Sequence, residues 1–197
     1  MELPGPLRFT VERRDCMASG VSAAYVVVDE RDGLYVGAAL VVDNRGVPLD
    51  FRYTEPLRPT KIERILYGGA LDVYLKEDVI VKGLVDALEV RPSLWLVREM
   101  DALGAVRQHG KGPTALVEST SLAPLDRTGQ ADLQGELEFL LQVDPISSPV
   151  RVVLTKDQLQ QASKVFEQLV SLGETMEVLE PFGRVIRALE ALKDEPL

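Results

Sequence analysis

Alternation of apolar and polar side chains dominates the first quarter of the chain. Between residues 47 and 54, Val, Leu, Phe and Tyr occupy every second position, with polar residues or Pro between them. A period of two predicts a half-buried β-strand. Apolar runs at residues 23–28 and 34–43, joined by polar turns that contain glycine, predict two more strands and therefore an antiparallel meander. Alternation at residues 7–11 predicts a strand before it, and Gly37 predicts a bulge or a close backbone approach.

Helical spacing begins after this meander. Thr60 and Glu63 have the spacing of a capping box, so we expect a helix to start there. Two glycines at residues 68–69 bend or end it, and apolar residues near period 3.6 predict a second helix at about residues 71–88. The apolar run at residues 94–97, which contains the single Trp, predicts a buried strand.

The second half of the chain is less regular. Three glycines and several cations predict a loop over residues 104–113. A second capping-box pattern at residues 155–158 predicts a helix that ends near residue 172, and Pro181 fits the first turn of a last helix. Further apolar runs predict strands at residues 114–117 and 150–154, and residues 137–143 return to apolar character.

The order of these elements predicts an α+β fold or a mixed-sheet α/β fold. An antiparallel β-meander is followed by helices, and a strand–helix–helix unit closes the chain. We expect residues 1–145 to form the core domain. Residues 146–197 form the extension, which either packs on the same core or makes a small subdomain.

Composition narrows the class of protein. With 197 residues, 46% of them hydrophobic, the chain is long enough and apolar enough to bury a core. We expect a cytoplasmic protein with no membrane-spanning segment, because the apolar runs are short and Cys16 is the only cysteine. Cys16 and His109 are each alone, which excludes an intramolecular disulfide and argues against a Cys/His zinc site.

The net charge of the chain limits which partners it can bind. A net charge of −9 lacks the broad positive field that drives non-specific binding to nucleic acid, so we expect no bulk binding to duplex nucleic acid. A local basic patch still fits one phosphate group. The sequence leaves a homo-oligomer open.

The first candidate site is the corner between the third meander strand and the next helix, residues 51–64. Cations near a helix N-terminus favour an anion, and arginine recognises phosphate or carboxylate in a bidentate way. Our leading interpretation is a non-enzymatic protein that binds a small anionic ligand or a protein partner there, with no cofactor. The residues that would do so are Arg52, Thr54, Glu55, Arg58, Lys61 and Arg64.

The alternative interpretation is an enzyme. A meander followed by a helix and a buried strand resembles the opening order of ribonuclease H-like folds, which implies divalent metal held by acidic residues near strand ends. The alternative is therefore a nuclease or phosphotransferase that depends on Mg²⁺ or Mn²⁺. The acidic residues near the predicted strand ends are Asp29, Glu30, Glu55, Glu99 and Asp101.

The cations at residues 107–112 are a third candidate for phosphate contact. They do not fit the G-x-x-x-x-G-K-[ST] pattern of a P-loop, and no G-x-S-x-G elbow accompanies His109. The run VDNRGVPLDFRYTEPLRPTKIERILYG resembles segments of bacterial proteins of unassigned function, over about residues 35–95. That resemblance implies no activity, ligand or catalytic residue.

Overall fold

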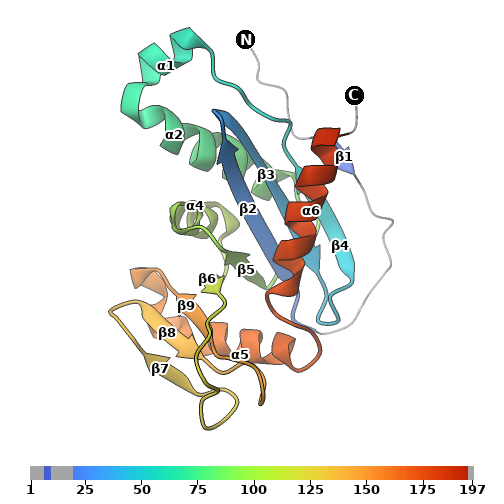
Figure 1. Cartoon of the computed structure of the whole chain (residues 1–197), viewed down its shortest axis with the longest axis vertical. Helices are drawn as coiled ribbons and strands as arrows, with labels where there is room; N and C mark the ends of the chain where they lie inside the picture. The colour runs from blue at the N-terminus through green and yellow to red at the C-terminus, as the bar shows by residue number, and fades with distance from the viewer. Residues whose placement is uncertain (1–6, 10–19, 195–197) are drawn as a thin grey trace.

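The computed structural model describes residues 7–9 and 20–194, and its centre is one mixed β-sheet (Figure 1). In the described residues the sheet has nine strands in the order β1-β4-β3-β2-β5-β6-β9-β8-β7. The strands are β1 (Leu7–Phe9), β2 (Ala23–Arg31), β3 (Leu34–Val42), β4 (Pro48–Tyr53), β5 (Leu94–Val97), β6 (Thr114–Glu118), β7 (Ala131–Leu133), β8 (Glu138–Leu141) and β9 (Val150–Val153).

The predicted meander and the mixed fold class are confirmed. β2, β3 and β4 pair antiparallel, with Val26 opposite Ala39 and Leu40 opposite Phe51. β5 then pairs parallel to β2, and β6 parallel to β5. β9 joins the same sheet beside β6, so the strand of the C-terminal extension lies in the common sheet. The domain boundary after residue 145 stays a prediction.

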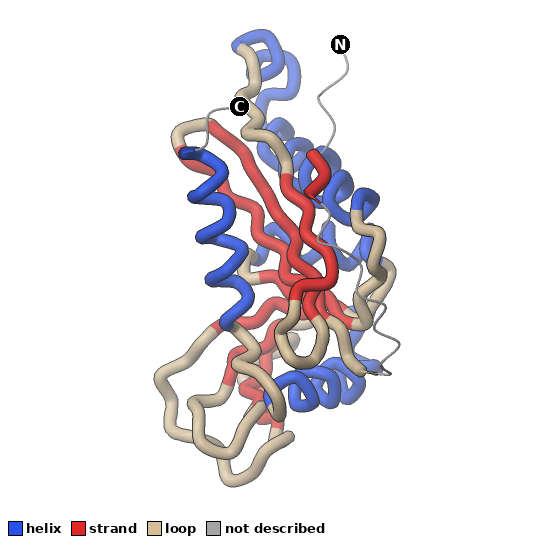
Figure 2. The backbone as a smooth tube through the Cα atoms, turned by 90° about the vertical axis from the view of Figure 1, so that its right-hand side faces the viewer, coloured by secondary structure: helices blue, strands red, loops and turns tan. Residues whose placement is uncertain are grey.

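Helices cover both faces of the sheet (Figure 2). α5 and α6 pack on one face, and the helices that connect β4, β5 and β6 pack on the other. The helical elements are α1 (Lys61–Tyr67), η1 (Gly68–Ala70), α2 (Leu71–Val73), η2 (Tyr74–Val81), α3 (Lys82–Ala87), α4 (Met100–Gly110), η3 (Lys156–Gln161), α5 (Ala162–Gly173) and α6 (Glu180–Asp194). None of these helices is long and apolar enough to cross a membrane, as far as the described residues go.

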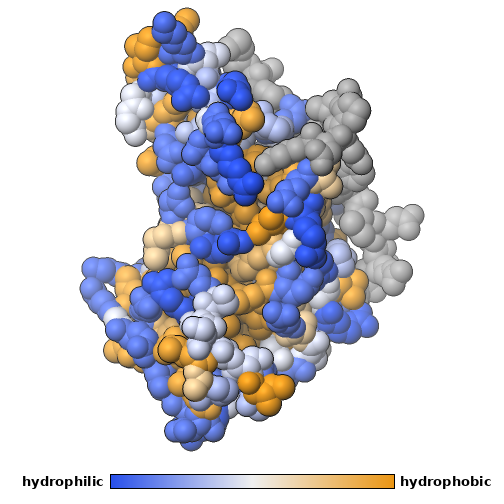
Figure 3. Space-filling model, viewed as in Figure 1, coloured by the Kyte–Doolittle hydropathy of each residue, from blue (hydrophilic) through white to orange (hydrophobic). Residues whose placement is uncertain are grey.

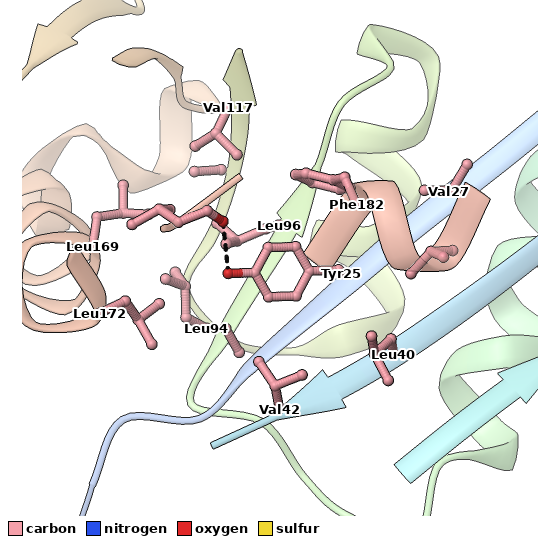
Figure 4. Close-up of a cluster of buried hydrophobic side chains, with 14 of the residues drawn as sticks. Tyr25, Val27, Leu40, Val42, Leu94, Leu96, Val117, Leu169, Leu172 and Phe182 are labelled. Atoms are coloured by element: carbon pink, nitrogen blue, oxygen red, sulfur yellow. Dashed lines mark hydrogen bonds between the residues drawn. The ribbon is translucent and has the colours of Figure 1, made fainter. Parts of the chain in front are cut away.

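The central strand β2 is apolar on both faces because each face meets helices. Tyr25 and Val27 point toward α5 and α6, whereas Val26 points toward the opposite helices. The Tyr25 hydroxyl donates a hydrogen bond of 2.8 Å to the Val178 carbonyl oxygen, and its ring meets Phe182 edge-on at 4.9 Å (Figure 4). These contacts fasten the start of α6 to the sheet.

The helix predictions were partly correct. The capping box of α1 is confirmed: Thr60 accepts from the Glu63 amide at 3.2 Å, and Glu63 accepts from the Thr60 amide at 2.6 Å. The prediction of a second capping box is wrong. The Thr155 hydroxyl donates to the Asp157 carboxylate and caps no backbone amide, and residues 156–161 form a 3₁₀-helix. The predicted second helix exists, but it includes a π-helical stretch, η2.

α1 projects from the body of the molecule (Figure 1), and all seven of its residues are exposed or half-buried. Ile62, Ile65 and Leu66 are 68%, 70% and 76% exposed, and Figure 3 shows hydrophobic side chains at this tip. The helix therefore depends on its own cap more than on packing.

The loop predicted at residues 104–113 is also wrong, because most of it is α4. Gly104 lies on the exposed side of the helix, and Gly110 lies against Trp95, where a Cβ would come within 2.7 Å of the indole. Glycine here permits close packing at the end of the helix. The Arg107 guanidinium, one of the cations predicted to contact phosphate, binds groups of the protein itself: it pairs with Asp157 at 2.9 Å and donates to the Gly112 carbonyl oxygen.

Candidate active site at the carboxyl ends of β2 and β5

A pocket lies where the parallel strands β2 and β5 end. Val26 is the partner of Val97, the last residue of β5, so the residues that follow β5 come beside the second half of β2. The crevice outside the carboxyl ends of parallel strands is the usual ligand site in open α/β sheets. The cavity measures about 220 Å³, and helix α6 closes one side. Its lining consists of Val27, Val28, Asp29, Arg31, Arg98, Glu99, Ile186, Leu189 and Glu190.

β2 supplies a carboxylate and a guanidinium. Asp29 and Arg31 lie two positions apart on the strand, so both side chains project from the same face. Arg31 Nε lies 3.0 Å from Asp29 Oδ2, and the guanidinium is the more exposed of the two groups. This pair places one negative and one positive group at the mouth of the pocket.

Glu99 is the second residue after β5 and is the most perturbed group of the pocket. Its Oε1 lies 3.2 Å from Arg98 Nε, while its Oε2 is buried and has no hydrogen-bond partner among the described residues. Burial raises the pKa of Glu99 to about 7, against the opposing effects of the Arg98 charge and the Val28 amide. Near neutral pH this carboxyl group therefore exists in both protonation states.

Helix α6 adds a third acidic side chain, Glu190. Ile186 and Leu189 hold this part of the helix at the pocket, and Glu190 lines it one position later. Sequence reasoning missed Arg31, Arg98 and Glu190. The two arginines gave a usable signal, because they flank strand ends, but nothing local marks Glu190.

Whether these residues fit a metal ion depends on the substrate. Among the described residues, no three His, Cys, Asp or Glu side chains are arranged to hold a metal ion. Mg²⁺, however, is commonly bound by one or two carboxylates, with water and substrate phosphate as the other ligands. Asp29 and Glu99, with one buried oxygen of Glu99 unpartnered in the described residues, fit such a partial site.

The acidic residues of the alternative prediction do not all converge. Asp29 and Glu99 line the pocket, whereas Glu55 lies outside the pocket lining, on the connection after β4. Glu30 accepts a hydrogen bond from the Gly33 amide in the β2–β3 turn. Asp101 pairs with Lys76 at 2.9 Å, so it acts on Glu99 only through its charge.

The corner at residues 51–64 does not form one surface. Arg52 is fully buried, pairs with Asp50 at 3.0 Å and donates to the Ala87 carbonyl oxygen at 2.9 Å. Thr54 is also buried and accepts from the Gly37 amide. In contrast, the other three cations of the predicted set are exposed: Arg58, Lys61 and Arg64.

Comparison with known proteins identifies the fold. No protein-family model and no curated protein sequence matches the chain. Solved structures do match. Human endonuclease V has a TM-score of 0.58 at 13% identity, over 95% of this chain and 92% of that one. Endonuclease V from Streptomyces avermitilis has a TM-score of 0.53 at 20% identity, over 97% and 84%.

The chain has the fold of endonuclease V. A further match is Ciona intestinalis endonuclease V in complex with a 23mer DNA that contains an inosine followed by a ribo-adenosine. It has a TM-score of 0.53 at 14% identity, over 91% of this chain and 88% of that one.

These endonuclease V matches correct the leading interpretation. The predictions of a non-enzymatic protein, of an anion- or protein-binding function and of a small-anion or protein partner are contradicted, because the matching solved structures are nucleases. Burial of Arg52 gives the physical reason, since a guanidinium already paired in the interior does not reach an external ligand. The matches favour the alternative interpretation, a metal-dependent nuclease or phosphotransferase with a ribonuclease H-like core, over the leading one. The resemblance to bacterial proteins of unassigned function stays a prediction.

Proposed function

We propose that this protein is a metal-dependent nuclease that processes nucleic acid at the pocket between β2, β5 and α6. The observation that carries the proposal is Glu99, a carboxylate with a buried oxygen that has no hydrogen-bond partner among the described residues. It lies at the strand ends of an endonuclease V fold, beside Asp29. Perturbed carboxyl groups in a cleft are typical of catalytic sites.

The residues of the pocket have distinct roles in hydrolysis of a phosphodiester. Glu99 would hold the metal ion, together with Asp29, through the buried oxygen that has no hydrogen-bond partner among the described residues. Arg98 and Arg31 offer guanidinium groups to the phosphate oxygens, where negative charge grows in the transition state. Mg²⁺ or Mn²⁺, held by Asp29 and Glu99 together with substrate oxygens, would supply Lewis-acid stabilisation of that charge.

The partner that we propose is nucleic acid, in place of the small anion or protein expected from the sequence. The net charge of −9 argued against binding to duplex, but proteins of this fold have been crystallised with 23mer and 24mer DNA, which contradicts that prediction. Local guanidinium groups and a metal ion can substitute for a broad positive field. We also propose a cytoplasmic location, since the chain has a single cysteine.

The test is cleavage of labelled DNA and RNA oligonucleotides, single- and double-stranded, with Mg²⁺ or Mn²⁺. Glu99→Gln and Asp29→Asn should each lower the rate about 100-fold or more. Glu167→Gln, which removes an exposed acid on α5 outside the pocket, is the matched control and should cleave normally. Absence of cleavage in the wild type, or full activity in Glu99→Gln, would overturn the proposal.

A further inference from the structure

Two further cavities lie next to the pocket at Glu99, beside α6. A cavity of about 430 Å³ shares Arg98 and Ile186 with it. A third, of about 210 Å³, shares Ser119 and Leu179 with the second. Because neighbouring cavities have lining residues in common, the three lie one after another beside α6, and we call this row of cavities the α6 groove. Figure 3 shows hydrophobic surface on this face beside α6, with hydrophilic side chains around it.

The chemistry of the α6 groove changes along its length. Arg98 stands at the junction of the first two cavities and is about half exposed. Phe182 and Val117 give the middle an apolar wall. Hydroxyl groups line the far end, from Ser119, Thr120, Ser147 and Ser148. Guanidinium and hydroxyl groups are common partners of backbone phosphates, and apolar walls suit the faces of bases.

Two of the acidic residues along the groove are already engaged. Glu118 pairs with Arg151, and Asp144 accepts hydrogen bonds from the Ile146 and Ser147 amides at 3.0 and 2.8 Å. Both charges are therefore compensated within the protein, which lessens their repulsion of a phosphate.

We propose that one strand of the nucleic acid lies along the α6 groove, from the Asp29–Glu99 pocket past Arg98 to the hydroxyl groups at its far end. The inference rests on the proposed nuclease function and adds the path of the strand. The middle cavity, about 430 Å³, lies within the size range of a small-molecule site, about 300–1,000 Å³, and the two outer cavities lie below it, so none of the three admits a duplex. The occupant is thus a run of a few nucleotides from a single strand.

Gly183 allows a clean test, because it lines the middle cavity on α6. A Cβ built there meets Arg187 Nη1 at 3.6 Å, an ordinary contact, so Gly183→Leu fills the groove without crowding the helix. Gly104→Leu is the matched control. Gly104 is an exposed helical glycine on α4, outside the groove, and no described atom lies within 4 Å of its Cβ position.

Binding is measured by fluorescence anisotropy with labelled oligothymidylates of 3, 6 and 12 nucleotides, in EDTA, so that cleavage plays no part. We expect wild-type affinity to rise between 3 and 6 nucleotides. Gly183→Leu should weaken the binding of the 6mer and the 12mer about tenfold, a loss of about 1.4 kcal/mol, and leave the 3mer unchanged. Gly104→Leu should bind like wild type.

If Gly183→Leu and the wild type bind oligothymidylates of every length with equal affinity, the proposal that the strand lies along the α6 groove is wrong. That result is separable from failure of the nuclease proposal, which would leave length-dependent binding intact without any cleavage. If Gly183→Leu has a lowered melting temperature, Arg98→Gln provides the second variant, with Arg58→Gln as its control, an exposed arginine on the connection after β4 and outside the groove lining. Arg98→Gln should then weaken the binding of the 6mer, and Arg58→Gln should not.

Discussion

The buried position of Glu99 lowers the stability of the folded protein when the carboxyl group is ionised. Burial raises the pKa of this group from 4.5 to about 7. Between these two pH values the folded protein binds more protons than the unfolded chain, so the free energy of unfolding falls as pH rises through this interval and stays reduced above it. The group that the proposed reaction needs is thus one that the fold tolerates at a cost.

Replacing Glu99 by Gln removes this cost. We expect Glu99→Gln to melt about 2–4 °C above the wild type at pH 8, the change that about 1 kcal/mol produces in a chain of this size. At pH 4.5 or below, where Glu99 is protonated, the two proteins should melt alike. Circular dichroism at both pH values measures this, and equal melting temperatures at pH 8 would contradict the unfavourable burial of the charge.

Arg52 is the opposite case, a charge that the fold requires. Arg52→Ala leaves the Asp50 carboxylate buried without its guanidinium partner, and we expect a loss of about 3–5 kcal/mol of stability in urea denaturation. Arg58→Ala, on an exposed side chain of the same segment, should change stability by less than about 0.5 kcal/mol. A near-neutral Arg52→Ala would contradict the structural role of this arginine.

At the scale of elements, Gly37 sets how closely β3 and η2 approach. A Cβ at this position would lie 2.4 Å from Ile80 Cγ2, so Gly37→Ala should cost about 1–3 kcal/mol. Gly83→Ala, in α3 with no described atom within 4 Å, should stabilise by about 0.5–1 kcal/mol. Adding Ile80→Ala to Gly37→Ala should cost less than the sum of the single changes, as measured by a double-mutant cycle.

The elements that the sequence predicted well are those whose signal is local. Period two gave β4, short apolar runs between polar turns gave β2 and β3, and the Thr60–Glu63 spacing gave the start of α1. α4 was missed because its glycines resemble a loop, and the reason for one of them, Gly110, is contact with Trp95. The sequence around residue 110 does not encode that contact.

The candidate site was also predictable only where its residues carry a local signal. Asp29 and Glu99 were identified because each follows an apolar run that ends in charge. Their meeting depends on the parallel pairing of β2 with β5, which are separated by more than 60 residues of chain. Glu190 comes from the last helix, so only the packing of α6 on the sheet brings it to the pocket.

For the whole molecule, the sparse positive charge predicts how binding responds to salt. Arg31 and Arg98 are the two guanidinium groups of the pocket. Two phosphate contacts on a single strand correspond to a slope of about −1.4 in a plot of log K against log salt concentration. We expect this value for a 6mer between 50 and 200 mM NaCl. A slope steeper than about −4 would require a basic surface elsewhere on the protein.

Stability is also unevenly distributed across the molecule. The sheet is covered on both faces, whereas α1 keeps its apolar side chains in solvent. An isolated helix of seven residues is marginal in water, and a capping interaction adds about 1 kcal/mol. α1 is therefore a segment that unfolds locally while the sheet stays intact. Its backbone amides should exchange with solvent deuterium well before those of β2 and β5.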